Sequence, residues 1–336
     1  MQHRLKERSI FFRTETLVLL LIYIAIRGTS YALVGHSIIQ ALLVFALMMT
    51  LGIAYFKHEN YAWFILLGEF FLGGAGHFLE FFGLSVRSAL VLTFLFLWIV
   101  FTLSDPEKKK NIKPPHRLFL SFIPLFFFVA LSALLGLFHG HPYLYVIQDA
   151  LPFLFLLLAL PSYHLFKDRS MQDYVVRLAT VFIIGSALFS LLLFILYASG
   201  LYQIHDPLYQ WFRDVSMGKI TQVTPYFVRI VTPEHLLITP SILVILSLLM
   251  KDEKHHAMWR LLLSLGLLIL ALNFSRAYLL GFFVGILVLI YKHKPLKWLR
   301  ESALALMIGF ILFTSLNAIM SKGKSFGLEI VGVRIG

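Results

Sequence analysis

The chain has 336 residues, of which 59% are apolar and only 14% are charged. Soluble domains usually contain about 45–50% apolar and about 25% charged residues, so this composition excludes a soluble globular protein and indicates a membrane protein. The lack of cysteine excludes disulfides, zinc–thiolate sites and a thiol nucleophile. The net charge of +12 does not indicate nucleic acid as a partner, because the basic residues gather between apolar runs.

Apolar runs long enough to cross a membrane recur along the chain, and a crossing helix needs about 20 such residues. We expect an all-α, polytopic bundle of about eleven spans that forms one transmembrane domain over 1–336. Only the polar residues 273–277 separate the ninth and tenth spans, so one long helix over 258–291 is an alternative. The expected spans are 10–26, 37–56, 61–79, 86–103, 117–138, 143–163, 178–199, 232–250, 258–274, 277–291 and 301–320.

The orientation follows from the positive charges in the loops. With a cytoplasmic N-terminus, 20 of the 29 Lys and Arg residues lie on the cytoplasmic side. The basic clusters at 251–260 and 292–300 share that side only if two spans separate them, which favours a hairpin over 258–291. The segments 200–231 and 321–336 are then external. The charged N-terminal segment has no small-residue cleavage site, so we interpret it as a cytoplasmic tail.

The external segment 200–231 contains a helix signal near 206–215. Asp206 is a helix N-cap residue, and Pro207 suits the first helical position. Leu208, Trp211 and Phe212 follow at helical spacing, which predicts a short amphipathic helix lying in the outer interface.

The candidate functional residues lie mainly at the outer ends of the spans. The sequence has no Walker A, HExxH or GxSxG motif, and we see no metal-ligand cluster. Arg229 precedes the eighth span, with Glu234 and His235 one turn further, and Ser275 and Arg276 lie at the tip of the short hairpin. An arginine at the end of an apolar span needs a partner, and the guanidinium group suits phosphate.

The third expected span is unusual because it combines three ionisable residues with three glycines. Glu69, His77 and Glu80 are candidates for lining a cavity, and residues 77 and 80 would share one helix face. A structural pair is the alternative for His77 and Glu80. The same residues would form the path of a membrane transporter or a flippase for lipid-linked saccharides, although no repeat relates the two halves of the chain.

Two segments resemble the O-antigen ligase/O-antigen polymerase superfamily. LLILALNFSRAYLLGFFVGILVLI (267–290) is similar to the family's apolar hairpin with a Ser-Arg-Gly/Ala turn, and YFVRIVTPEHLLITPSIL (226–243) is similar to its upstream segment, with Thr-Pro-Glu-His in place of a small-Pro-Asn sequence. The resemblance implies a multi-pass glycosyltransferase of the bacterial inner membrane that needs no cofactor. Its glycan donor is linked to undecaprenyl diphosphate, and its acceptor at the periplasmic face is a saccharide or lipid A–core.

The resemblance also implies roles for individual residues. Arg229 and Arg276, with Ser275, would hold the diphosphate, and Arg334 would be the first functional arginine of a later external loop. The family's usual candidate base is a histidine in that loop, which would begin at 321–336. We therefore expect the sequence to be a piece of a longer protein, and a divergent member that uses His235 or Glu234 as the catalytic base is the alternative.

A second kind of lipid-carrier glycosyltransferase has an acidic motif in its first external loop. The corresponding loop here, RGTSYALVGH (27–36), contains no Asp or Glu, which argues against that class. Ligase and polymerase activities share the donor and differ only in the acceptor, so both remain open.

Overall fold

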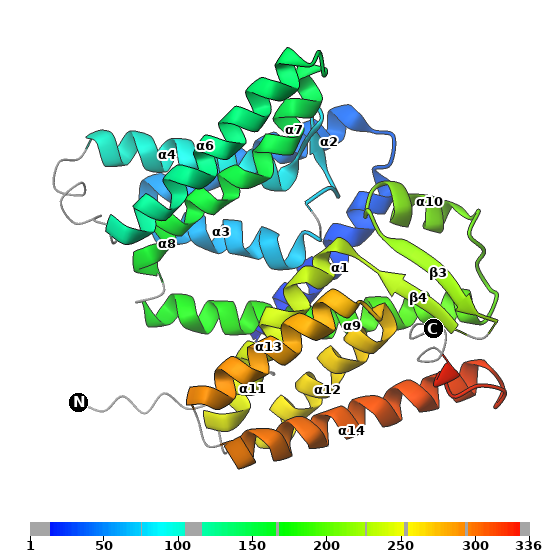
Figure 1. Cartoon of the computed structure of the whole chain (residues 1–336). Coiled ribbons are helices and arrows are strands. Elements are labelled where there is room, and N and C mark those ends of the chain that lie inside the picture. The colour runs from blue at the N-terminus through cyan, green and yellow to red at the C-terminus, as the bar shows by residue number, and fades with distance from the viewer. Residues whose placement is uncertain are drawn as a thin grey trace. The chain divides into compact units, whose positions relative to one another are not determined.

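The computed structural model describes residues 14–74, 76–104, 116–165, 168–225, 227–251, 255–292 and 295–329 (Figure 1). These residues contain eight helices that are long and apolar enough to cross a membrane, and two shorter apolar helices. Large apolar side chains such as Ile38 and Phe96 are exposed on the outside of the helices, as expected where lipid is the solvent. The predicted class, an all-α membrane protein, is confirmed in this coarse form. The count of eleven spans and the orientation stay predictions.

Helices follow one another with only two short hairpins of strands between them. The elements are α1 (Thr14–Ala32), α2 (Ser37–Lys57), α3 (Glu59–Leu72), β1 (Glu80–Phe81), β2 (Leu84–Ser85), α4 (Val86–Ser104), α6 (His116–Phe138), α7 (Tyr143–Leu154), the 3₁₀ helix η2 (Phe155–Leu158), α8 (Ala159–Leu165), α9 (Arg169–Ala198), α10 (Pro207–Asp214), β3 (Lys219–Thr224), β4 (Phe227–Val231), the 3₁₀ helix η3 (Pro233–Leu237), α11 (Ile238–Lys251), α12 (His256–Asn273), α13 (Arg276–Lys292) and α14 (Pro295–Met320).

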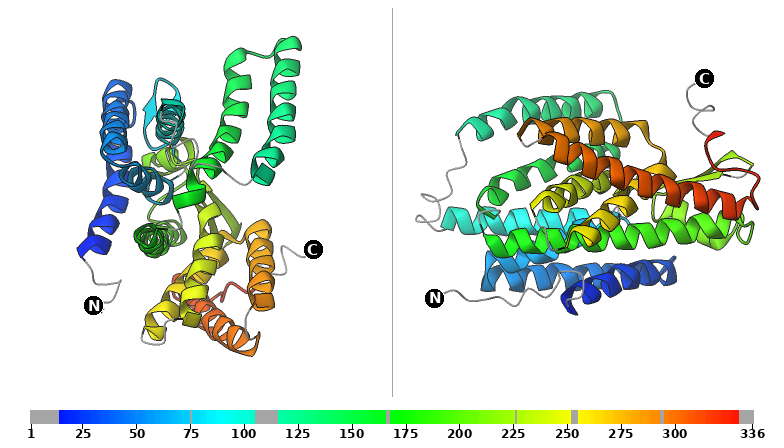
Figure 2. Two further views of the ribbon diagram at one scale, coloured as in Figure 1. Left: turned by 90° about the vertical axis from the view of Figure 1, so that its left-hand side faces the viewer. Right: turned by 90° about the horizontal axis from the view of Figure 1, so that it is seen from below.

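The chain divides into two compact units. The first comprises Met1–Val34, Phe70–Phe78 and Val175–Gly336, and the second comprises Gly35–Glu69 and Leu79–Tyr174. In the second unit α2 packs on α4, and α6 packs on α7 as a helical hairpin (Figure 2). The expected span 143–163 corresponds in this unit to the apolar helical segment Tyr145–Ser162, which contains a short 3₁₀ turn. Pro152 in α7 lacks an N–H donor, and the helix tightens to the 3₁₀ turn η2 before α8 begins.

The core of the first unit forms where a small cap packs on the ends of several helices. The cap consists of α10 and the antiparallel β3–β4 hairpin. Phe227 of β4 contacts the ring of Phe194 in α9 and the ring of Phe313 in α14. Trp211 and Phe212 of α10 are buried, and the indole N–H of Trp211 donates to Ser30 of α1 at 3.1 Å. The predicted helix near 206–215 is confirmed, but its apolar face is covered by protein instead of lying against lipid.

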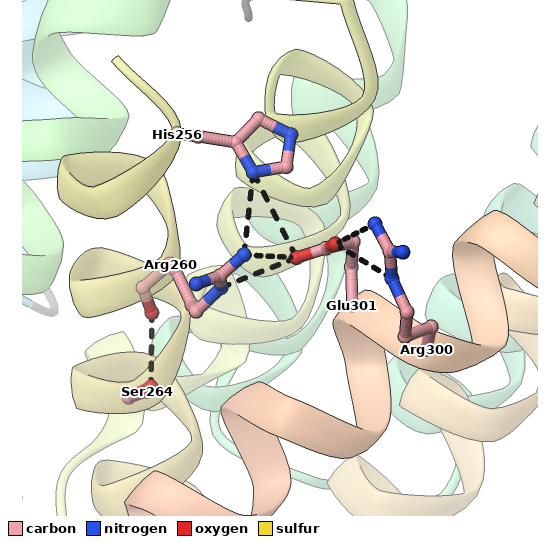
Figure 3. Close-up of polar contacts among 5 residues, drawn as sticks. All are labelled: His256, Arg260, Ser264, Arg300 and Glu301. Carbon is pink, nitrogen blue, oxygen red and sulfur yellow. Dashed lines mark hydrogen bonds and ion pairs between the residues drawn. The ribbon is translucent and has the colours of Figure 1, made fainter.

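A charged cluster joins α12 to α14 near the start of each helix, away from the cap (Figure 3). The side chain of Glu301 is fully buried and accepts hydrogen bonds from Arg260 at 2.8 Å and from Arg300 at 3.0 Å. His256 lies 3.8 Å from the same carboxylate. Because α12 and α14 start near this cluster and end near the cap, His256, Arg260 and Arg300 lie at one end of the first unit.

The region 258–291 forms two helices separated by a turn, so the alternative of one long helix is wrong. α12 ends at Asn273, Phe274 adopts a left-handed conformation with φ 48°, and α13 begins at Arg276. A left-handed residue at this position is a common helix terminator.

The expectation that 61–79 forms one helix is wrong, and this changes the geometry proposed for its ionisable residues. α3 ends at Leu72, and Gly74 and Gly76 follow with φ angles of 65° and 82°. Such angles favour glycine and are incompatible with a continuing α-helix. His77 therefore lies in a turn and Glu80 in β1, so these two residues do not share a helix face.

Close packing of α1 on α9 depends on a glycine. A Cβ added to Gly185 of α9 would lie 2.7 Å from the ring of Tyr23 in α1, whereas one added to Gly281 of α13 would meet only a methyl group at 3.7 Å. We predict that Gly185→Ala destabilises the protein by about 1–3 kcal/mol through overpacking. Gly281→Ala should be neutral or stabilising. Thermal unfolding of the purified variants in detergent measures both changes in stability. Equal changes in the two variants would contradict the close packing of α1 on Gly185.

The predicted orientation can be tested at positions whose side chains are exposed. Met217 and Lys324 lie in the segments expected outside, and Lys57 lies in a loop expected inside. Because the chain has no cysteine, single substitutions Met217→Cys, Lys324→Cys and Lys57→Cys provide unique thiols. In intact spheroplasts, an impermeant maleimide should label the first two and should label Lys57→Cys only after lysis. Labelling of Lys57→Cys without lysis would reverse the orientation.

Candidate functional site

A buried ion pair lies at the centre of the first unit. Arg27, near the end of α1, donates through its Nη2 to Oε2 of Glu234 in η3. The two side chains are only 6% and 3% exposed. A charge in such surroundings is costly unless it is paired and hydrogen-bonded, so the pair fixes α1 to the start of η3.

Neighbouring groups satisfy most of the remaining hydrogen-bonding capacity of this pair. The Tyr23 hydroxyl donates to Oε1 of Glu234 at 3.2 Å, and Ser186 of α9 donates to the same oxygen at 3.4 Å. Nη1 of Arg27 donates to the carbonyl oxygens of Tyr23 and Leu72 at 3.1 and 3.2 Å. The guanidinium carbon also lies 3.4 Å from the centroid of the Tyr23 ring. The Arg27–Glu234 pair therefore joins α1, α3, α9 and η3.

His235, the next residue of η3, is fully buried and holds the end of α12. Its Nδ1 accepts from Nδ2 of Asn273 at 2.7 Å and from the backbone N–H of Thr232 at 3.4 Å. Its Nε2 lies 3.4 Å from the hydroxyl of Ser190 in α9. Because Nδ1 accepts from two donors, a neutral His235 carries its proton on Nε2.

Asn273 also accepts a hydrogen bond from Arg229, one of the two candidate diphosphate ligands. Arg229 of β4 donates from Nε to the backbone carbonyl of Asn273 at 2.5 Å. Asn273 is the last residue of α12, and Ser275 and Arg276 follow directly after the left-handed Phe274. The Arg229 side chain thus reaches the same turn from which Arg276 begins α13. Arg229, Ser275 and Arg276 belong to one structural feature, although 47 positions separate the two arginines in sequence.

The other candidate residues lie elsewhere. Glu69 belongs to the second unit, where its Oε2 accepts from Nε of Arg87 at 2.9 Å. Glu80 is exposed in β1, and its backbone N–H donates to the Gln40 side chain at 3.2 Å. Arg334 lies outside the described residues. Within the part of the chain that the structure describes, no group of three His, Asp or Glu residues could hold a metal ion.

Sequence reasoning missed Arg27, Asn273 and the β3–β4 hairpin. The end of the apolar run predicts a loop at Arg27, but α1 continues to Ala32. The available signal was Arg27 itself: a lone charge beside an apolar segment needs a partner, and Glu234 is a second such charge. Asn273, at the end of an apolar helix, is a similar signal. The hairpin also has a signal, because β-branched residues are frequent in 219–231 on both sides of Thr224 and Pro225, a pattern typical of paired strands.

A comparison of the chain with models of protein families, with curated proteins and with solved structures finds no match.

The buried ion pair gives a prediction for stability. Arg27→Met should lower the free energy of unfolding by roughly 3–5 kcal/mol, because it leaves the Glu234 carboxylate buried without its cation. The double variant Arg27→Met, Glu234→Gln should be more stable than Arg27→Met alone. Thermal unfolding in detergent gives the double-mutant cycle.

Arg213→Ala serves as the control for this cycle. Arg213 is 58% exposed and pairs with Asp214 on the surface of α10, so its loss should change stability by less than about 1 kcal/mol. Additive effects of the Arg27 and Glu234 substitutions would show that the two side chains do not interact.

Proposed function

We propose that the protein transfers a glycan from an undecaprenyl-diphosphate carrier to a saccharide or lipid A–core acceptor at the periplasmic face of the bacterial inner membrane, in the manner of O-antigen ligases and polymerases. The observation that carries this proposal is the hydrogen bond from Arg229 Nε to the Asn273 carbonyl. This bond holds Arg229, one predicted diphosphate ligand, at the turn between α12 and α13. The other two predicted ligands, Ser275 and Arg276, follow in that turn and at the start of α13.

The chemistry requires charge stabilisation more than any other assistance. The bond between the anomeric carbon of the donor sugar and the diphosphate oxygen breaks while an acceptor oxygen bonds to that carbon. Negative charge develops on the leaving diphosphate. Two guanidinium groups beside the leaving diphosphate stabilise that charge, and each can donate two parallel hydrogen bonds to phosphate oxygens.

The acceptor hydroxyl must lose a proton during transfer, and Glu234 and His235 are the predicted acceptors of this proton. That catalytic role stays a prediction. In the described conformation both side chains are buried and hydrogen-bonded, and this supports a positioning role as well. Glu234 holds Arg27 and α1, while His235 holds Asn273 and with it the turn before Arg276.

The network explains how a diphosphate site can be formed by segments so far apart in sequence. β4 supplies Arg229, and the α12–α13 turn supplies Ser275 and Arg276. Asn273 contacts both His235 and Arg229, through its side chain and its carbonyl respectively. A site held in this way is preorganised, so little reorganisation is needed when charge develops.

The proposal predicts the effects of substitutions at the two arginines. Arg229→Ala or Arg276→Ala should lower the rate of glycan transfer by about 10²–10³-fold, the usual cost of removing one group that stabilises developing charge. Lysine should restore little activity at Arg276, because an ammonium group cannot reproduce the bidentate fork. Transfer is measured in proteoliposomes with a lipid-linked oligosaccharide donor.

The matched control is Arg213→Ala, since Arg213 lies in the same external segment but is exposed and paired with Asp214. Its transfer rate should equal that of the wild type. Each variant is first checked for an unchanged unfolding temperature, because Arg229 also supports the Asn273 turn. Wild-type transfer by a folded Arg276→Ala variant would contradict the proposed diphosphate site.

A further inference from the structure

A polar cavity of about 520 Å³ lies in the first unit between the residues that follow α9 and the β3–β4 hairpin. Its volume falls in the range of small-molecule sites, roughly 300–1,000 Å³. The deepest lining residues, Tyr197, Ile220 and Val228, are buried, and the rim is exposed. The rim residues that matter here are Ser199, Tyr202, Gln203, His205 and Gln222.

The cavity belongs to the same hairpin as the predicted diphosphate ligand Arg229. Val228 lines the cavity, and Arg229 is the next residue of β4. Successive side chains of a strand point to opposite faces. In the register of the hairpin, Gln222 pairs with Val228 and Thr221 pairs with Arg229, so the cavity residues share one face and Arg229 lies on the other. The two sites are therefore separated by the thickness of one hairpin.

The chemical character of the lining restricts the class of ligand. None of the described residues that line the cavity is Lys, Arg, Asp or Glu, which disfavours a phosphate or another small ion. The aromatic rings of Tyr197 and Tyr202 lie with their centroids 6.4 Å apart, and side-chain amides and a hydroxyl surround them. Aromatic rings pack on the C–H faces of a pyranose, while amides and hydroxyls bind its hydroxyl groups. This combination fits an uncharged saccharide.

One polar group in the cavity wall has no hydrogen-bond partner among the described residues. The Tyr197 side chain is nine-tenths buried, and its hydroxyl has no hydrogen bond within the described residues. A buried hydroxyl without a partner is costly, by about 1–3 kcal/mol. A small shift of the Tyr197 side chain toward the cavity would let a ligand hydroxyl remove that cost. Tyr197 is thus an independent indication that the cavity receives a polar ligand.

Hydrogen bonds fix the backbone of the rim around Tyr202, Gln203 and His205. The backbone N–H of Gln203 donates to Asp206 Oδ2 at 2.7 Å, and that of Tyr202 donates to the Leu196 carbonyl at 3.1 Å. Gln210 donates from its side chain to the His205 carbonyl at 3.3 Å. A loop held by its backbone loses less conformational entropy when its side chains bind a ligand.

We propose that this cavity is a saccharide subsite, in which the ring of Tyr202 packs on a sugar and the Tyr197 hydroxyl binds one of its hydroxyl groups. The inference rests on the proposed glycan transfer and adds a place where sugar residues distant from the diphosphate are bound. The saccharide comes either from the donor or from the acceptor, and the experiment below distinguishes the two sources.

Saturation-transfer NMR on the purified full chain in nanodiscs tests the proposal without requiring transfer. The donor probe is the lipid-free oligosaccharide released from the carrier by mild acid, and the acceptor probe is delipidated lipopolysaccharide core oligosaccharide. One of these two probes should show saturation transfer from the protein, and that probe identifies the source of the saccharide. Tyr202→Ala should weaken its binding at least 10-fold, whereas Tyr202→Phe, which keeps the ring, should bind like the wild type. Tyr197→Phe should bind severalfold more weakly with an undiminished unfolding temperature.

Leu201→Ala is the matched control, because Leu201 is 72% exposed in the same loop and does not line the cavity. It should bind both probes like the wild type. Arg276→Ala should also retain saccharide binding even though it loses transfer, which separates this test from that of the diphosphate site. Failure of the wild type to bind either probe would overturn the subsite, as would equal affinities of Tyr202→Ala and the wild type. Neither result would change the expected effect of Arg276→Ala on transfer.

Discussion

An ion pair in a medium of low dielectric constant is the constraint on which the first unit depends. Neither Arg27 nor Glu234 can remain charged and buried without the other, so α1 and η3 must meet. Their contacts with Tyr23, Ser186 and Leu72 bring α9 and the end of α3 to the same point. Replacing such a pair with apolar residues often preserves stability, so we attribute its presence here to the fixed positions that it imposes on these segments.

Asn273 extends this fixed arrangement to the turn between α12 and α13. Its side chain binds the imidazole of His235, and its carbonyl accepts from Arg229. Because His235 directly follows Glu234, the ion pair and the turn are connected through two successive residues of η3. The position of Arg276 relative to Arg229 therefore depends on four buried side chains, those of Arg27, Glu234, His235 and Asn273. The β3–β4 hairpin then places the cavity with Tyr197 and Tyr202 on its other face.

The sequence predicted the features that depend on local composition. The long apolar helices, the turn after Asn273 and the short helix introduced by Asp206 and Pro207 each have a local signal, and the structure contains all three. The sequence was a poor guide to those features that depend on tertiary contacts. Arg27 stays in a helix because Glu234 neutralises it, and the third apolar run stops at Leu72 because glycines with positive φ follow. For the site, sequence selected Arg229, Ser275 and Arg276, but only the structure reveals Asn273 as the residue between them.

The central claim is that Arg229 and Arg276 bind one diphosphate, and a cryo-EM map of the full chain in nanodiscs with undecaprenyl diphosphate tests it most directly. The account predicts density for the diphosphate at the α12–α13 turn, with oxygens of both phosphates roughly 3 Å from guanidinium nitrogens of Arg229 and Arg276. Diphosphate density at another place in the bundle, or contact with only one of the two arginines, would contradict it.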